Sequence, residues 1–257
     1  MNRTRIALNI HLLGGLLMGM FALLLLPAGG TSAVALASNC GQWSIVASPN
    51  PGSTDILSGI TAISPQDVWA VGNYVDIRDL HQVLIEHWNG TQWRVIPSPN
   101  LDTLDNGLSG VAFLSSTDVW AVGATSSGTL IEHWDGTRWR VIPSPGARGV
   151  LLGVSTLSFT DVWAVGDVVV GRTTNTLTEH WDGSTWSILK SPSPGAFGNQ
   201  LVSVAAISST NVWAVGYTAT TRFGEQALVV DWNGTSWNVV PSSLSERSRY
   251  LSSVMVY

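Results

Sequence analysis

Two short strings recur four times along the chain, and together with Trp43 they contain all 13 of its tryptophans. The first string reads Val-Trp-Ala-Val-Gly after Asp or Asn, and the second reads Trp-Asn/Asp-Gly-Thr/Ser-x-Trp. The second string starts at positions 88, 134, 181 and 232, in steps of 46, 47 and 51 residues. A repeat of this length is typical of folds in which each unit is one supersecondary element stacked on its neighbours.

Each unit is predicted to form four short antiparallel strands, named A to D. In the first unit, strand A lies near 57–64, strand B starts at Val68, strand C covers 83–88, and strand D covers 91–96 and ends before Pro97. Asn-Gly or Asp-Gly between strands C and D indicates a tight hairpin, because both turn residues need a positive φ.

The hairpin determines which side chains share a face of the sheet. A two-residue turn at Asn89 and Gly90 would pair Trp88 with Thr91. Alternation then places one set of side chains on one face and a second set on the other. The first set is Leu84, Glu86, Trp88, Trp93 and Val95, and the second is Ile85, His87, Arg94 and Ile96. Both sets include large apolar groups, so both faces must be packed, as in a propeller blade between two neighbours.

The spacings separate a constant rim from a variable one. The A–B spacing from Leu57 to Asp67 recurs unchanged in all four units, as does the five-residue spacing of the C–D Trp pair. The Trp-to-Trp separation across the B–C connection instead varies as 19, 14, 18 and 19 residues. In an up-and-down meander the A–B and C–D turns share one rim. The B–C and D–A loops therefore form a variable rim.

The two strings resemble those of bacterial secreted β-propeller repeat proteins, which are similar to Kelch and galactose-oxidase propellers. The resemblance covers about 41–257. A Kelch blade has Gly-Gly after strand B, whereas this chain has one Gly there, as in Gly72-Asn73. The C–D hairpin is similar to the Asp-box of sialidases, except that the Asp-box has a residue between Asp and Gly. The resemblance implies a propeller and leaves the function open.

We therefore expect an all-β protein, a β-propeller of four-stranded antiparallel blades. Complete blades are predicted at 56–97, 107–143, 150–190 and 200–241. Two orphan strands, 42–47 and 250–257, would belong to an incomplete fifth blade. An apolar blade face without a neighbour is costly to expose, and an unpaired edge can recruit another chain, so we expect self-association through the open blade edge.

The N-terminus is predicted to be a secretory signal peptide over 1–37, cut between Ala37 and Ser38, which leaves 38–257 as a secreted or cell-surface propeller. It has a basic start, a long apolar run and an A-x-A-like site. The alternative is an uncleaved anchor, which would be the only membrane contact. Cys40 suggests a lipoprotein, but Asn39 stands where such sites need a small residue.

Composition excludes some classes of function. The net charge is -5, from 12 Lys plus Arg against 17 Asp plus Glu, which is inconsistent with a basic nucleic-acid-binding surface. The single cysteine, Cys40, cannot form an intramolecular disulfide. It also precedes the first blade, so galactose-oxidase copper chemistry is not supported. No cofactor and no catalytic or metal-binding residue is assigned.

Three Glu-His pairs occupy the same position in successive units: Glu86-His87, Glu132-His133 and Glu179-His180. Adjacent strand residues point to opposite faces, and the copies lie in separate blades, so they cannot converge on one site. We expect the glutamates to pair with a backbone or Trp N–H group and the histidines to pack between blades.

The variable rim is the candidate for function, because loops on a rigid scaffold commonly bind ligands. We predict a non-enzymatic scaffold that binds a glycan or a surface protein there. The alternative is a sialidase-type glycoside hydrolase, in which an arginine cluster (Arg78, Arg148, Arg172 and Arg222) would hold a carboxylate. Candidate ligand-binding residues are Tyr74, Arg78, His81, Arg172, Tyr217, Arg222 and Phe223.

Overall fold

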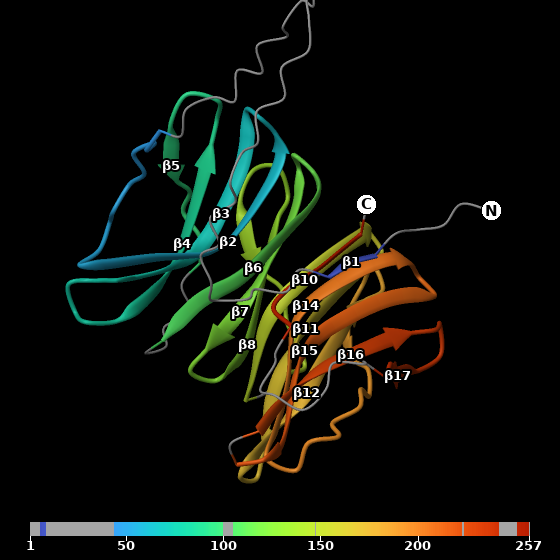
Figure 1. The fold of residues 1–257 in the computed structure, drawn as a ribbon. Helices are drawn as coiled ribbons and strands as arrows, with labels where there is room; N and C mark the ends of the chain where they lie inside the picture. Colours follow the sequence, from blue (N-terminus) through green and yellow to red (C-terminus); the bar gives the residue numbers. More distant parts are fainter. Residues whose placement is uncertain are drawn as a thin grey trace, which may run out of the picture. The chain divides into compact units, whose positions relative to one another are not determined.

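The computed structural model describes residues 6–8, 44–99, 105–146, 148–222, 224–241 and 251–256. Within these ranges all regular structure is β, and no helix there is long and apolar enough to cross a membrane. Four antiparallel four-stranded sheets follow one another along the chain (Figure 1). The prediction of four-stranded propeller blades is confirmed.

Each blade is a meander in which sequential strands are neighbours. Blade 1 comprises β2 (Thr54–Ser64), β3 (Asp67–Val75), β4 (His81–Trp88) and β5 (Trp93–Val95). Blade 2 comprises β6 (Asn106–Ser115), β7 (Asp118–Thr125), β8 (Gly128–Trp134) and β9 (Trp139–Val141). Blade 3 comprises β10 (Gly149–Ser158), β11 (Asp161–Val170), β12 (Thr173–Trp181) and β13 (Trp186–Ile188). Blade 4 comprises β14 (Gly198–Ser208), β15 (Asn211–Thr221), β16 (Gly224–Trp232) and β17 (Trp237–Val239).

The glycine that ends each Val-Trp-Ala-Val-Gly string is required by close packing between strands A and B. Strand A is irregular between Leu57 and Gly59, and this brings the carbonyl oxygen of Ile56 against Gly72. A Cβ on Gly72 would overlap that oxygen, and the corresponding glycines of the other blades meet a strand A carbonyl in the same way. The string therefore keeps a residue without a side chain at this position.

The C–D hairpin differs from the predicted two-residue turn. Trp88 pairs with Trp93, so 89–92 form a four-residue loop and strand D is shorter than expected. The Asn89 side-chain oxygen accepts hydrogen bonds from the backbone N–H groups of Thr91 and Gln92, at 3.1 Å each, and from the Thr91 hydroxyl at 2.8 Å. This Asx-type loop needs positive φ only at Gly90. The predicted faces stay correct because the register moves by two residues.

Tryptophans fill the junctions between blades. Trp69 of blade 1 packs on Trp134 and Trp139 of blade 2, with ring centroids 5.1 and 5.4 Å apart. Trp120 packs in the same way on Trp181 and Trp186, and Trp163 on Trp232 and Trp237. The first string of each of these blades thus supplies the group that the C–D hairpin of the next blade receives.

The predicted orphan strands have different outcomes. Near the C-terminus, β18 (Val254–Val256) follows Leu251, and both Leu251 and Val254 pack on the buried face of blade 4. β18 pairs antiparallel with β1 (Ile6–Leu8), which lies in the segment predicted to be a signal peptide. The strand expected at 42–47 is wrong for its described part, because 44–47 have no regular structure. A strand D needs a strand C beside it to satisfy its backbone groups, and the described residues give 44–47 no such neighbour.

Candidate binding site at the variable rim

A cavity of about 340 Å³ opens at the variable rim between blades 1 and 2. Strands A and B of both blades and the start of β4 contribute its walls. Ile56 and Leu108 supply apolar surface, and most of the remaining lining is polar. The polar lining residues are Ser58, Asn73, His81, Asp105, Asn106, Ser109 and Thr125.

The imidazole of His81 is the centre of the polar wall. Its Nδ1 lies 2.8 Å from the side-chain nitrogen of Asn73, and its Nε2 lies 3.9 Å from the carboxylate of Asp105. His81 starts β4 opposite Val75, so Asn73, two residues before Val75, lies diagonally across the strand pair on the same face. The His81 side chain is 46% exposed. It therefore offers a ring nitrogen to a ligand in the cavity.

A second polar group occupies the same rim between blades 3 and 4. The Gln200 amide donates to the carboxylate of Asp167 at 2.5 Å. Burial raises the pKa of Asp167, although the Gln200 hydrogen bond acts to lower it. Burial also raises the pKa of Tyr217, and the nearby charges of Glu225 and Asp167 add to this effect. The group is acidic and mostly paired within the protein.

Of the predicted rim residues that the structure describes, only His81 lines the cavity. Tyr74 lies on β3 against Gly52, and Tyr217 belongs to the second polar group. Arg172 and Arg222 are exposed in B–C turns, and Phe223, Ala37 and Ser38 fall outside the described residues.

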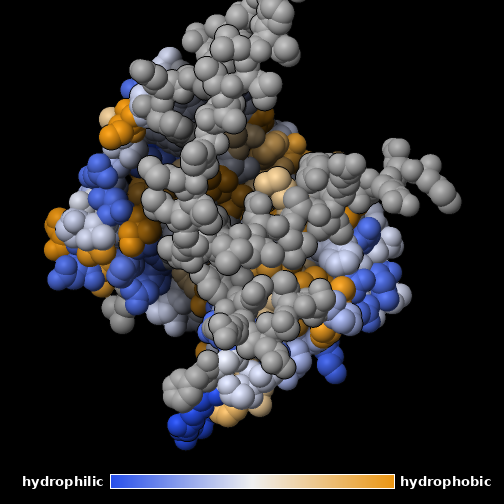
Figure 2. Space-filling view, viewed as in Figure 1, coloured by the Kyte–Doolittle hydropathy of each residue, from blue (hydrophilic) through white to orange (hydrophobic). Residues whose placement is uncertain are grey.

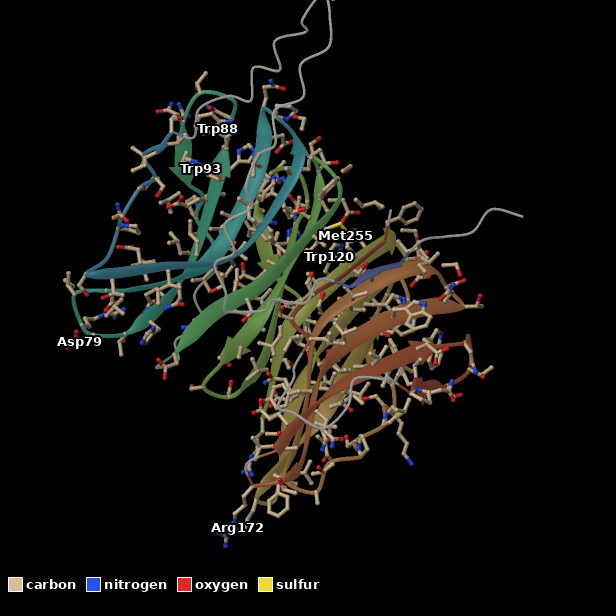
Figure 3. The ribbon with its side chains drawn as sticks, in the orientation of Figure 1. Asp79, Trp88, Trp93, Trp120, Arg172 and Met255 are labelled. Carbon is tan, nitrogen blue, oxygen red and sulfur yellow. The ribbon has the colours of Figure 1, made fainter. Side chains whose placement is uncertain are left out.

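Arg78, Arg148 and Arg172 lie in three different connections. Arg78 forms an ion pair with Asp76 at 2.7 Å, and this hydrogen bond lowers the pKa of Asp76. Figure 3 shows Arg172 and Asp79, the neighbour of Arg78, at the tips of separate loops. Arg148 lies in a third connection, with a φ of 60°. Arg78 is thus paired with an aspartate of its own loop, at a different loop tip from Arg172.

Sequence reasoning missed Asn73, Asp105 and Asp167. Asn73 and Asp167 each follow the glycine of the first string, where the other units have Ala124 and Tyr217. A position that varies directly after a constant string, at the end that faces the variable rim, is a signal that could have identified them. Asp105 precedes β6 in a connection without a repeated pattern, and nothing in the sequence indicates its place.

The constant rim contains three His-Asp pairs within single blades. His87 Nε2 lies 2.8 Å from the Asp67 carboxylate, and its ring packs on Trp69 at 4.2 Å. The corresponding distances in blades 2 and 3 are 2.9 and 4.2 Å, and 3.0 and 4.3 Å. Each histidine is thus held between its own Asp and Trp. The described residues contain no group of three His, Cys, Asp or Glu side chains placed to hold a metal ion.

Two of the three glutamates of the Glu-His pairs have partners that were not predicted. Instead of a backbone or Trp N–H group, Glu132 accepts a hydrogen bond from the Ser98 hydroxyl, and Glu179 accepts one from Ser144 at 2.7 Å. Each serine comes from the D–A connection of the preceding blade. Burial raises the pKa of Glu132 to about 7 and that of Glu179 to about 6.

Comparison with known proteins concerns the fold. No protein-family model matches the sequence, and no curated protein matches it. Similar solved structures include YCF48 bound to a D1 peptide, with a TM-score of 0.42, 13% identity, and coverage of 72% of this chain and 52% of that one. A gluconolactonase from Xanthomonas campestris has a TM-score of 0.41, 10% identity, and coverage of 75% and 76%. An exo-inulinase from Aspergillus awamori has a TM-score of 0.36, 12% identity, and coverage of 69% and 50%. The chain spans about half the length of the first and third of these propeller proteins.

Proposed function

We propose that this β-propeller is a non-enzymatic, secreted or cell-surface binding scaffold, and that the cavity around His81 binds the polar end of a glycan. The observation that supports this function is the cavity of about 340 Å³ with polar groups on an apolar base. Small-molecule sites commonly start at about 300 Å³ and combine apolar walls with a few polar groups that orient the ligand.

The chemistry of the walls favours a neutral, hydroxyl-rich ligand. Asn73, His81 and Thr125 offer both donors and acceptors, whereas the Asp105 carboxylate only accepts. Sugar hydroxyls can both donate and accept. An anionic ligand would meet the Asp105 carboxylate without an arginine in the lining to offset it.

Binding can be tested with a glycan array followed by calorimetry on the best ligand. His81→Ala should raise the Kd about tenfold, the effect of losing about 1.4 kcal/mol of hydrogen bonding. Arg172→Ala, an exposed change on the same rim outside the cavity, is the matched control and should leave the Kd unchanged. Equal Kd values for wild type and His81→Ala would exclude the cavity as the ligand site.

A fluorogenic glycoside panel tests the hydrolase alternative. Under the binding-scaffold proposal we expect no turnover above the rate without protein. Robust hydrolysis that is lost in Arg78→Ala or Arg222→Ala would show that the protein is a glycosidase and would contradict the binding-scaffold proposal.

The secreted location is tested by processing. The mature protein recovered from the medium should start at Ser38. Protein that retains its N-terminus and stays in carbonate-washed membranes would support the anchor instead.

A further inference from the structure

Two of the three repeat glutamates are held by a serine from the connection that precedes their blade. Glu132 and Glu179 are both fully buried, and the hydroxyls of Ser98 and Ser144 donate to them. A buried carboxylate needs such a donor, because it has lost its hydrogen bonds to water. The serine therefore joins one repeat to the next.

A fixed spacing identifies these serines in the sequence. Each one follows the strand D Trp of its own repeat by five residues and precedes a proline, as in Trp93, Ser98 and Pro99. The same spacing leads from Trp43 to Ser48-Pro49, ahead of blade 1.

Blade 4 has neither the glutamate nor the serine contact. Val230 stands at the glutamate position there, so no carboxylate is available. Ser191, at the serine position ahead of blade 4, instead bonds to the Thr176 hydroxyl of blade 3 at 2.7 Å.

Glu86 of blade 1 lacks the partner that its equivalents have. Its side chain is fully buried, and neither carboxylate oxygen has a hydrogen-bond partner among the described residues. Ser48 is exposed in this structure. Blade 1 thus contains the acceptor of the repeated contact, Glu86, without a serine donor. Ser48, the serine at the matching spacing, does not contact a carboxylate in the described part of the chain.

The connecting chain has a suitable length for the contact. Ser48 precedes the first residue of β2, Thr54, by six positions. The equivalent separations are eight from Ser98 to Asn106 and five from Ser144 to Gly149. The separation of six residues at blade 1 thus lies between the two separations, five and eight, at which the contact is present in the structure.

We propose that the Ser48-Pro49 segment docks on blade 1 and that the Ser48 hydroxyl donates a hydrogen bond to the Glu86 carboxylate. The segment is then part of the first blade's packing. The repeated contact starts at blade 1 and joins each glutamate-bearing blade to the chain that precedes it.

A double-mutant cycle tests the contact through thermal unfolding at constant pH. Ser48→Ala should lower the Tm by about 2–4 °C. The same change should have no effect in a Glu86→Val background, which copies the natural residue of blade 4. Ser144→Ala with Glu179→Val is the matched cycle for a contact present in the structure. An unchanged Tm for Ser48→Ala, or an equal loss in both backgrounds, would overturn the proposal.

A second measurement does not depend on removing the carboxylate. A cysteine placed by Ser48→Cys should react with iodoacetamide as slowly as one placed by Ser144→Cys, with peptide mapping to separate it from Cys40. Ser127→Cys, an exposed position, is the fast reference. Labelling of Ser48→Cys at the rate of the exposed reference would also overturn the proposal. Ser48→Thr retains the hydroxyl and should keep the wild-type Tm.

Discussion

In each of blades 1 to 3, one tryptophan contacts the C–D hairpin of the next blade, and Trp120 is a suitable position to measure the effect of this contact. Trp120 is 2% exposed between the rings of Trp181 and Trp186. Trp120→Ala should lower the free energy of unfolding by about 3–5 kcal/mol, because truncation leaves a cavity between two blades. Trp213→Ala is the matched control, since Trp213 has the same position in its string but is only half-buried. Measured by chemical denaturation, Trp213→Ala should lower the free energy of unfolding clearly less than Trp120→Ala does. Equal losses in the two variants would contradict the assigned junctions.

A buried carboxylate with a raised pKa makes stability depend on pH. The pKa of Glu132 is about 7 in the folded protein, against an ordinary value of 4.5. The protonated form is therefore favoured by folding, and its contribution, on the order of 3 kcal/mol, is complete below pH 4.5 and is lost as the pH rises to 7. Glu132→Gln should flatten the fall in Tm between these values. Asp79→Asn, a change at an exposed loop tip, should leave the fall in Tm as it is in the wild type. If Tm falls equally in the wild type and in Glu132→Gln, Glu132 is not the group responsible.

At the scale of the element, the C–D hairpin depends on one carboxylate or amide oxygen. The Asp182 carboxylate accepts hydrogen bonds from the N–H and hydroxyl of Ser184 and from the N–H of Thr185. Asp182→Ala should lower the Tm by about 2–4 °C. Asp182→Asn should be tolerated at neutral pH, because Asn89 and Asn233 occupy the same position in blades 1 and 4.

The Asp182 hairpin also predicts an acid limit to stability. Hydrogen bonds from Ser184 and Thr185 lower the pKa of Asp182 to about 2. Its contribution is therefore present above the ordinary value of 3.8 and is lost as the pH falls towards 2. Asp182→Asn does not titrate and should remove this part of the acid loss in a Tm profile. If the dependence of Tm on pH is the same in Asp182→Asn and in the wild type, protonation of Asp182 does not contribute to the acid loss of stability.

The strands could be predicted because the constraints on them repeat. Trp, Gly and alternating apolar residues recur at the same positions in four units. The assignment of side chains to sheet faces, and of residues to turns, can therefore be checked four times within one sequence. The hairpin register was wrong by two residues, because the Asn89 side chain stabilises a four-residue loop that Asn-Gly alone does not distinguish from a tight turn.

The cavity could not be predicted in the same way. His81, Asn73 and Asp105 meet across a strand pair and a blade junction, and the same combination of residue types does not recur in the other units. A side chain such as Glu132 could be recognised as structural from its repetition, but its partner Ser98 lies 34 residues away in the preceding connection. Contacts across a junction depend on how the blades stack, which the pattern of one unit does not contain.

At the scale of the whole molecule, blade 1 differs from the later blades in how its apolar residues are covered. Leu57 of blade 1 is 45% exposed, whereas its equivalents Leu108, Leu151 and Leu201 are at most 2% exposed. Trp93 is only half-buried beside Trp88 in the hairpin of blade 1 (Figure 3), whereas its equivalent Trp139 is buried. Figure 2 shows hydrophobic side chains mixed with hydrophilic ones on the surface over blade 1. Blade 1 therefore presents groups that blades 2 to 4 bury against a preceding blade.

Apolar surface of this kind favours association by about 25 cal/mol per Å² that it buries, so we predict that the protein self-associates through blade 1. Sedimentation velocity over a wide range of concentration should show the mean mass rising with concentration. Leu57→Glu together with Ile60→Glu should hold the protein as a monomer, because a charge on this face would lose its water in the contact. Phe159→Glu is the control, since Phe159 is 71% exposed outside this face. It should associate as the wild type does. A wild-type protein that stays monomeric at every concentration would show that this face does not drive association.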